Sequence, residues 1–136
     1  MADTQSRSTL TLAGADRVTA AAEAFAAEQG WAATICVADA AGVPLVVRRA
    51  EAAWPASVQI AIGKAESAIR FGRPTAALET MINDGRTAFV GVAGVTPLRG
   101  GLPIVVDGAV VGAVGVSGLT PERDEQVAEA GVGALG

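Results

Sequence analysis

Histidine and tyrosine are absent from the 136 residues, and cysteine occurs once, at Cys36. Without histidine the chain lacks the commonest general base and the commonest zinc ligand, and Ser-His-Asp and Cys-His catalytic arrangements are excluded. One cysteine without histidine leaves no ligand set for a structural zinc site and no disulfide within one chain. Any catalysis would therefore depend on lysine, arginine, carboxylates, hydroxyl groups or backbone amides.

Aromatic and charged residues are also scarce, at 4% and 18% of the chain, whereas hydrophobic residues make up 51%. With so few aromatic side chains, alanine, valine and glycine must fill the core, so the elements are expected to pack closely together. The formal net charge of −4 argues against a nucleic-acid partner, because phosphate binding needs clustered lysine and arginine.

No apolar run is long enough to cross a bilayer, and the first residues lack the apolar region of a secretory signal. We therefore expect a soluble, cytoplasmic protein with no membrane partner. The length favours one domain over residues 1–136, with residues 1–8 frayed.

The feature around which the chain is organised is Asp107-Gly108, which separates the apolar runs 104–106 and 109–116. This dipeptide between β-branched runs predicts a hairpin with a type I′ turn, which needs a positive φ at both central residues. Because both runs are apolar at nearly every position, we expect a hairpin in the centre of the fold with both faces covered. The expected pairs are Val106–Ala109, Val105–Val110 and Ile104–Val111.

Glycines gather on both sides of this hairpin. Gly100-Gly101-Leu102-Pro103 precedes it and is expected to lie at the rim of any site, because two glycines permit a positive φ or a close backbone approach. Within and after the second strand, Gly112, Gly115 and Gly118 remove side chains. Such a strand serves either close packing or access for a ligand, and packing is the commoner use.

The remaining pattern predicts helices packed on one antiparallel sheet, an α+β domain. A helix capped by Thr9 or Thr11 and stopped by Gly30 precedes strands at 34–38 and 43–48. Helices are expected at 57–71, with a Glu66–Arg70 pair and a stop at Gly72, and from Pro74 to Ile82. Residues 86–95 are expected to be a loop with some extended structure, and Thr120-Pro121 opens the last helix.

Three polar positions are candidates for a site. Lys64 lies on a mostly apolar helical stripe, where desolvation would suit it to bind an anion or act as a base; the commoner alternative is a lysine that snorkels to solvent. Arg99 would clamp a carboxylate against the Gly100 and Gly101 amides, or be an ordinary loop arginine. Ser117-Gly118 would form an anion nest, or simply close a strand.

Four segments carry a family resemblance: Ile60-Ala-Ile-Gly-Lys-Ala65, Phe71-Gly-Arg-Pro-Thr-Ala-Ala-Leu78, Gly100–Gly108 and Gly112–Gly118. Together with Pro121-Glu-Arg-Asp-Glu125 they resemble the family of the haem-binding protein HbpS, GlcG and the PduO C-terminal domain. The resemblance covers nearly the whole chain.

The resemblance implies a single antiparallel five-stranded sheet with flanking helices, similar to a profilin-like or PAS-like arrangement, in dimers or larger homo-oligomers. It implies a pocket between the helix that bears Lys64 and Gly100–Pro103, with haem or corrinoid handling among the family's activities. Haem iron is usually held by His, Cys, Met or Tyr, and this chain has no His or Tyr. Cys36, expected to be a small core residue, Met81 and Met1 are the remaining donors, so tight axial ligation is not expected. Haem would lie on apolar walls, with its propionates on Lys64 or Arg99. The positions that match the family are Lys64, Arg73, Thr75, Gly100, Gly101, Pro103, Gly112, Gly115, Ser117 and Gly118.

Three functions follow as hypotheses. The first is an oligomeric domain that binds a small anionic organic ligand, such as haem or a related tetrapyrrole. The second is a cofactor-independent isomerase, hydratase or cyclase acting on a small oxygenated substrate, with Lys64 as catalytic base and the Gly100 and Gly101 amides stabilising an enolate-like oxygen. A structural oligomer without a ligand is the third. The ligand-binding candidates are Lys64, Arg73, Thr75, Arg99, Gly100, Gly101, Leu102, Pro103 and Ser117.

Overall fold

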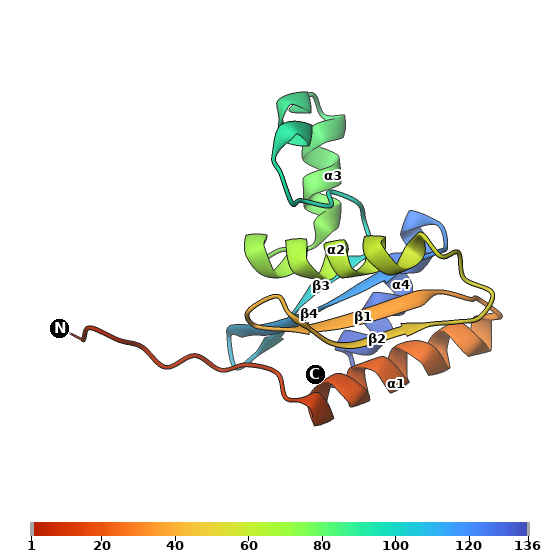
Figure 1. Ribbon diagram of the computed structural model, residues 1–136, viewed down its shortest axis with the longest axis horizontal. Helices are drawn as coiled ribbons and strands as arrows, with labels where there is room; N and C mark the ends of the chain where they lie inside the picture. Colours follow the sequence, from red (N-terminus) through yellow and green to blue (C-terminus); the bar gives the residue numbers. More distant parts are fainter. Residues whose placement is uncertain (1, 136) are drawn as a thin grey trace.

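The computed structural model describes residues 2–135 and confirms an α+β architecture (Figure 1). The strands form one antiparallel sheet in the order β2-β1-β4-β3. In chain order the elements are α1 (Leu12–Gln29), β1 (Thr34–Asp39), β2 (Pro44–Arg49), α2 (Ser57–Phe71), α3 (Thr75–Asn83), the 3-10 helix η1 (Thr87–Gly91), β3 (Gly101–Val106), β4 (Ala109–Ser117) and α4 (Pro121–Val132).

The expectation of five strands is wrong, because the sheet has four. Residues 86–95, for which some extended structure was expected, contain η1 and no strand. Among the element contacts, η1 packs on α3 and not on a strand, so no neighbouring strand is available to pair with this segment.

The ends of the helices follow the local signals. Thr11, rather than Thr9, caps α1 and accepts a hydrogen bond from the Gly14 N–H at 3.0 Å; the Thr9 hydroxyl instead accepts from Ala40 N–H. Gly30 and Gly72 end α1 and α2 with φ angles of 76° and 61°. Two further predictions are confirmed. Glu66 and Arg70 form an ion pair within α2 at 2.8 Å, and Thr120 caps α4, which begins at Pro121.

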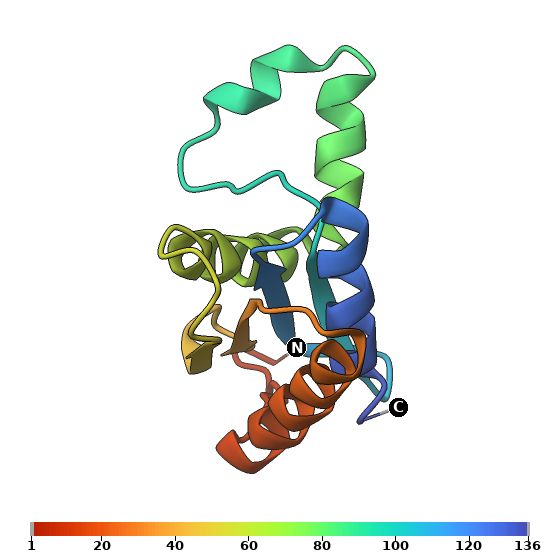
Figure 2. The same ribbon diagram turned by 90° about the vertical axis from the view of Figure 1, so that its right-hand side faces the viewer.

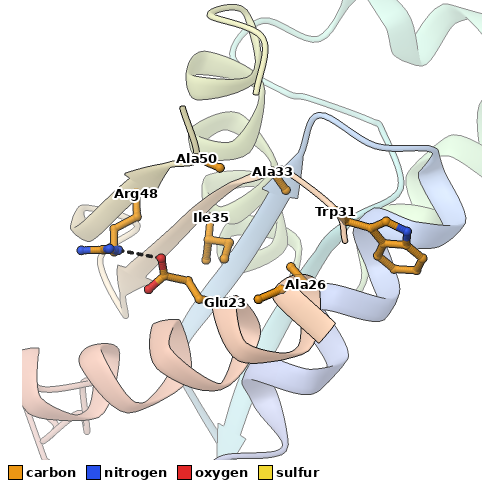
Figure 3. Close-up of a pocket in the computed structure, with 8 residues that line it drawn as sticks. Glu23, Ala26, Trp31, Ala33, Ile35, Arg48 and Ala50 are labelled. Carbon is orange, nitrogen blue, oxygen red and sulfur yellow. Dashed lines mark hydrogen bonds and ion pairs between the residues drawn. The ribbon is translucent and has the colours of Figure 1, made fainter. Parts of the chain in front are cut away.

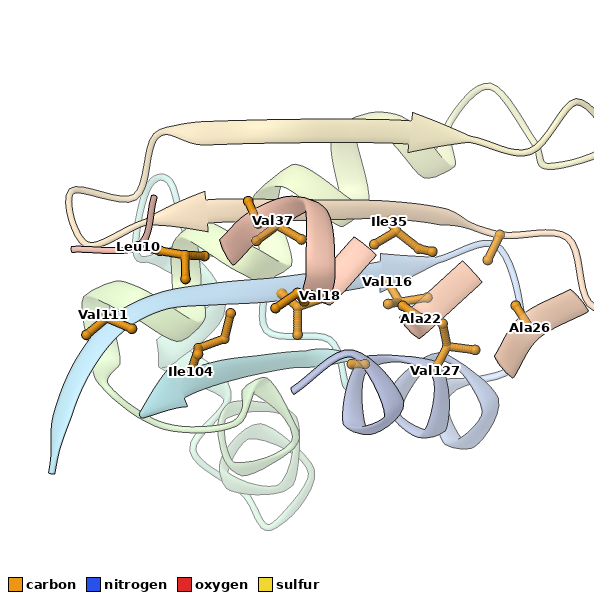
Figure 4. Packing of buried hydrophobic residues seen from close by; sticks show 14 residues of the cluster. Leu10, Val18, Ala22, Ala26, Ile35, Val37, Ile104, Val111, Val116 and Val127 are labelled. Atoms are coloured by element: carbon orange, nitrogen blue, oxygen red, sulfur yellow. The ribbon is translucent and has the colours of Figure 1, made fainter. Parts of the chain in front are cut away.

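α1 and α4 cover one face of the sheet and α2 covers the other (Figures 1 and 2). The larger core lies between the sheet and the pair α1 and α4, where the side chains of α1 point toward those of β1 and β4 (Figure 4). On the other face α2 lies close to β1 and β4, because the buried hydrophobic side chains between them are all small, as the composition predicted. These are Cys36, Ala38, Ala61, Ala65, Ala68 and Ala113.

The hairpin turn is confirmed, with φ angles of 50° at Asp107 and 78° at Gly108. The pairs Val106–Ala109 and Val105–Val110 form as expected, but Ile104 lies opposite Gly112 rather than Val111. The register shifts there because β4 carries one extra residue, a bulge that leaves Val111 without a partner on β3. The freed Val111 carbonyl accepts the N–H of Leu10 at 2.9 Å, which attaches the N-terminal segment to the sheet.

Only one strand of the hairpin is central. β4 lies between β1 and β3 and is buried along most of its length, whereas β3 is an edge strand. Val105 on β3 is 54% exposed, so the expectation that both faces of the hairpin are covered holds for β4 and is wrong for β3. The apolar pattern of the two strands is the same, and only the order of strands in the sheet distinguishes them.

The segment from residue 73 to residue 99, hereafter the arm, stands away from the sheet (Figures 1 and 2). Only Thr75 and Leu78 of α3 are buried, and no residue of η1 is. One aromatic contact ties the arm to α2: the rings of Phe71 and Phe89 meet edge to face at 5.6 Å. The arm therefore presents apolar side chains to solvent, among them Val90, Val92 and Leu98.

Candidate functional site

Lys64 lies on the sheet-facing side of α2 and is only 3% exposed, so the snorkelling alternative is wrong. Its ammonium group donates to the Val116 carbonyl at 2.8 Å and forms an ion pair with Asp124 Oδ2 at 3.1 Å. The desolvation predicted from the apolar stripe is therefore present. The group's hydrogen bonds are made to the protein itself, and they connect α2 to β4 and α4.

Asp124 is the residue of this centre that the sequence reasoning missed. It lies in the first turn of α4, and such an acid is ordinarily explained by the helix dipole alone. Burial raises the pKa of the Asp124 carboxyl, and this effect exceeds the opposing influence of the Lys64 charge and of the Leu119 N–H, which donates to Oδ1 at 3.0 Å. The partner could have been suspected only from the apolar surroundings of Lys64, which demand a buried counter-charge.

The glycines beside this ion pair serve close packing. A Cβ on Gly100 would lie 2.8 Å from the Val116 carbonyl oxygen and 2.9 Å from the Lys64 ammonium, and the residue has a φ of 129°. A Cβ on Gly101 would lie 2.5 Å from the Lys64 carbonyl oxygen. The packing interpretation is thus confirmed here, and also at Gly112 and Gly115, which meet the main chains of β1 and α2. These contacts leave no room for a ligand between α2 and Gly100–Gly101.

Thr75 holds the Gly101 peptide. Its hydroxyl accepts the Gly101 N–H at 2.8 Å and lies 3.4 Å from the Gly101 carbonyl oxygen, and the side chain is fully buried. One of the two amides that were expected to stabilise an enolate-like oxygen, that of Gly101, therefore has a partner within the chain. Lys64, Thr75, Gly100 and Gly101 do lie together, as one packed cluster, and their role in ligand binding stays a prediction.

The other predicted site residues are dispersed. Arg99 is half-exposed and forms ion pairs with Glu125 at 3.0 Å and Glu122 at 3.7 Å, so it connects the end of the arm to α4. Its hydrogen bond to Glu125 and the charge of that residue raise the pKa of the Arg99 guanidinium. Ser117 is the last residue of β4, Arg73 is exposed between α2 and α3, and Leu102 and Pro103 are half-buried in β3.

Open hollows occur elsewhere on the molecule. One lies in the arm, has a volume of about 250 Å³ and is walled by Ile82, Val90, Pro97 and Leu98 with Glu79 and Asn83 at its polar side. Another, of about 180 Å³, lies between α1 and β2 (Figure 3). Sequence patterns do not reveal either hollow, because its walls meet only in the folded chain, from residues 79–98 for the first hollow and from residues 23–50 for the second.

The described part of the chain, residues 2–135, contains no helix long and apolar enough to span a membrane. Within the same residues no group of three His, Cys, Asp or Glu side chains is placed to hold a metal ion.

Comparison with known proteins gives consistent relatives. The chain is 43% identical over 103 residues to the protein GlcG of Escherichia coli K12, which covers 76% of this chain and 77% of GlcG. The crystal structure of Klebsiella pneumoniae protein ORFY has a TM-score of 0.92 at 31% identity and covers 99% of this chain and 96% of that chain. The crystal structure of a double mutant of Streptomyces reticuli HbpS has a TM-score of 0.90 at 32% identity, and the match covers 100% of this chain and 93% of that chain.

The sequence model of one family, described as "Haem degrading protein HbpS-like", matches residues 10–133, from the N-terminal attachment at Leu10 to the residue after α4. The match therefore includes the sheet, the arm and the buried ion pair. On this extent, and on the relatives in sequence and structure, the chain belongs to the HbpS-like family.

Proposed function

We propose that this protein binds a flat, anionic organic molecule of the tetrapyrrole class and holds it without a protein ligand to a central metal. The observation that carries the proposal is the match of residues 10–133 to a family described as haem degrading and HbpS-like. The likeness to HbpS, after which that family is described, at 32% identity over the whole chain supports the same family-based proposal.

Residues 2–135, which the structure describes, do not fit haem iron, and the candidate donor Met1 lies outside them. The sequence has no histidine or tyrosine, and Cys36 is fully buried under α2. Burial raises the pKa of the Cys36 thiol to about 12, so the thiolate that ligates iron does not form at neutral pH. Met81 on α3 is half-buried and gives only a weak thioether donor. Affinity must therefore come from apolar contact and from the anionic groups of the ligand.

The arm offers both kinds of contact. Its hollow has an apolar wall of isoleucine, valine, proline and leucine. Arg73 and Arg86 are exposed on the same segment, outside the residues that line the hollow, and within residues 2–135 neither forms an ion pair. The ammonium of Lys64 is enclosed with Asp124, so we assign the ligand's carboxylates to these two arginines rather than to Lys64.

We further propose that the protein is a homo-oligomer whose contacts cover the arm. A nine-residue helix is not stable in water on its own, and α3 buries only two residues within the chain. The hollow of about 250 Å³ is also smaller than the roughly 300–1,000 Å³ of a typical ligand pocket, which a second subunit would extend. Light scattering on the purified protein tests the oligomer directly.

The enzyme hypothesis finds less support, because Lys64 and the Gly101 amide, two of the groups assigned to catalysis, have hydrogen-bond partners within the protein. It stays a prediction.

The test compares haemin with iron-free protoporphyrin IX. If the metal is not ligated, both bind with affinities within about threefold of each other. Leu98→Glu places a negative charge in the arm hollow and is expected to weaken both at least about tenfold, whereas Val43→Glu, an exposed position in the β1–β2 turn, changes neither. Binding of haemin alone, with the sharp Soret band of an axially ligated iron, would overturn the proposal, as would binding of neither compound.

A further inference from the structure

A second hollow lies on the opposite side of the sheet from α2 and the arm, so an inference about it is independent of the proposed function. It opens between α1 and the edge strand β2 and has a volume of about 180 Å³ (Figure 3). It is lined by Glu23, Ala26, Ala27, Trp31, Ala33, Ile35, Arg48 and Ala50.

The floor of this hollow is apolar and made of small side chains. Ala26, Ala33 and Ile35 are almost completely buried, and the alanines leave space that a larger side chain would fill. A cavity of about 150 Å³ lined by apolar groups is large enough to take benzene. The floor therefore suits an aliphatic group of a few carbon atoms.

Trp31 lies at one end of the hollow and is held in place by its neighbours. Its ring meets Phe25 edge to face at 5.9 Å, and the guanidinium of Arg123 lies 4.9 Å from its ring centre. Both contacts stabilise the indole in this orientation. The hollow is thus preformed at this end.

The other end carries one charge of each sign. Arg48 on β2 donates through Nε to Glu23 Oε2 on α1 at 2.9 Å, and both side chains are exposed (Figure 3). Within residues 2–135 the Arg48 Nη atoms and Glu23 Oε1 have no other hydrogen-bond partner. A guanidinium presents five N–H donors, so the pair leaves donors and an acceptor free at the mouth.

We propose that this hollow binds a small zwitterion, an α-amino acid with an aliphatic side chain. Its carboxylate pairs with the Nη atoms of Arg48, its ammonium group with Glu23 Oε1, and its side chain lies on the alanine floor. A ligand with only a carboxylate would be attracted by Arg48 and repelled by Glu23. A ligand with only an ammonium group would be attracted by Glu23 and repelled by Arg48. Only a ligand with both charges complements the mouth without breaking the existing ion pair.

The experiment uses the full-length protein with Trp54→Phe, which leaves Trp31 as the single tryptophan; Trp54 is exposed and lies outside the hollow. L-leucine, isovalerate and isoamylamine are titrated by calorimetry and followed by Trp31 fluorescence. Leucine is expected to bind saturably, and the two singly charged analogues at least about tenfold more weakly.

Matched variants test the geometry. Arg48→Gln and Glu23→Gln are each expected to weaken leucine binding about tenfold, whereas Arg49→Gln, on the neighbouring position of β2 and outside the hollow, leaves it unchanged. Ala27→Phe, at an exposed position, fills the hollow and is expected to abolish binding. Absence of saturable leucine binding, or equal binding of isovalerate or of isoamylamine, would overturn the proposal.

Discussion

Replacing Lys64 by methionine tests the buried ion pair that connects α2 to α4. Methionine is close to lysine in length and keeps the apolar stem, so the change removes the ammonium and leaves the Asp124 carboxylate buried without its partner. Breaking a buried pair in this way costs about 3–5 kcal/mol of the free energy of unfolding. For 136 residues, with an unfolding entropy of roughly 2.1 cal/mol/K per residue, this corresponds to a Tm lower by about 10–17 °C.

The double variant Lys64→Met/Asp124→Leu separates the pair from its surroundings. With both charges removed, the cost of the buried carboxylate disappears, and we expect at least half of the lost free energy of unfolding to return. The remainder reflects two hydrogen bonds that the double variant also loses, from Lys64 to the Val116 carbonyl and from Leu119 N–H to Asp124. Arg70→Gln, which breaks the exposed Arg70–Glu66 pair, is the control and is expected to cost less than about 1 kcal/mol.

The pH dependence of the Lys64→Met effect has a definite sign. Burial raises the pKa of Asp124 above its unfolded value of 3.8, so between these two pKa values the folded state binds more protons than the unfolded state. The contribution of Asp124 to stability therefore falls as the pH rises through this window, and it recovers as the pH falls. Loss of Lys64 raises the pKa further, so the difference between variant and wild type is expected to shrink toward pH 4.

Urea unfolding of the four proteins between pH 4 and pH 8 measures all of these quantities. A cost below about 1 kcal/mol for Lys64→Met at pH 7 would refute the reasoning, since it would mean that the carboxylate is solvated or neutral. A double variant no more stable than the single one would refute it equally.

Three further predictions concern packing, reactivity and capping. Gly101→Ala forces a Cβ against the α2 main chain and is expected to lower the free energy of unfolding, measured in urea, by at least about 2 kcal/mol. The control Gly91→Ala has no atom within 4 Å of the new Cβ and is expected to change it by less than about 0.5 kcal/mol. Equal costs for the two variants would contradict the close contact at Gly101. Cys36, buried and with a pKa raised to about 12, is expected not to react with a thiol reagent at pH 8 until the protein is unfolded, and rapid labelling of the native protein would show that α2 opens. Thr11→Ala removes the cap of α1 and is expected to lower stability by about 1 kcal/mol, while Thr4→Ala in the exposed N-terminal segment has no effect; similar Tm values for the two variants would argue against the cap.

The local elements were predictable because their causes lie within a few residues of each other. The turn at Asp107-Gly108 and the Gly30 stop each satisfy a backbone conformation or an orphan hydrogen bond of their own segment. The small residues of the sheet and α2 also predicted close packing. The sequence shows where a side chain is small or absent, although it does not show which neighbouring main chain approaches that position.

The predictions that failed depend on which segments meet. The same apolar pattern in β3 and β4 indicated two covered strands, but sheet order made one of them an edge. Residues 86–95 had no neighbouring strand to pair with, so the fifth strand of the family expectation is absent. The bulge at Val111 was equally unpredictable from the turn, because it coincides with the attachment of Leu10 from the far end of the chain.

The sequence by itself determined the kind of elements, their ends, the family, and the absence of the side chains that usually hold haem iron, because composition and local backbone chemistry need no knowledge of the third dimension. Tertiary structure alone decided that Lys64 meets Asp124, sixty residues further along the chain, instead of solvent or a ligand. It also decided where the hollows lie. A buried charge needs a partner and a hollow needs walls, and both come from segments that only the folded chain brings together.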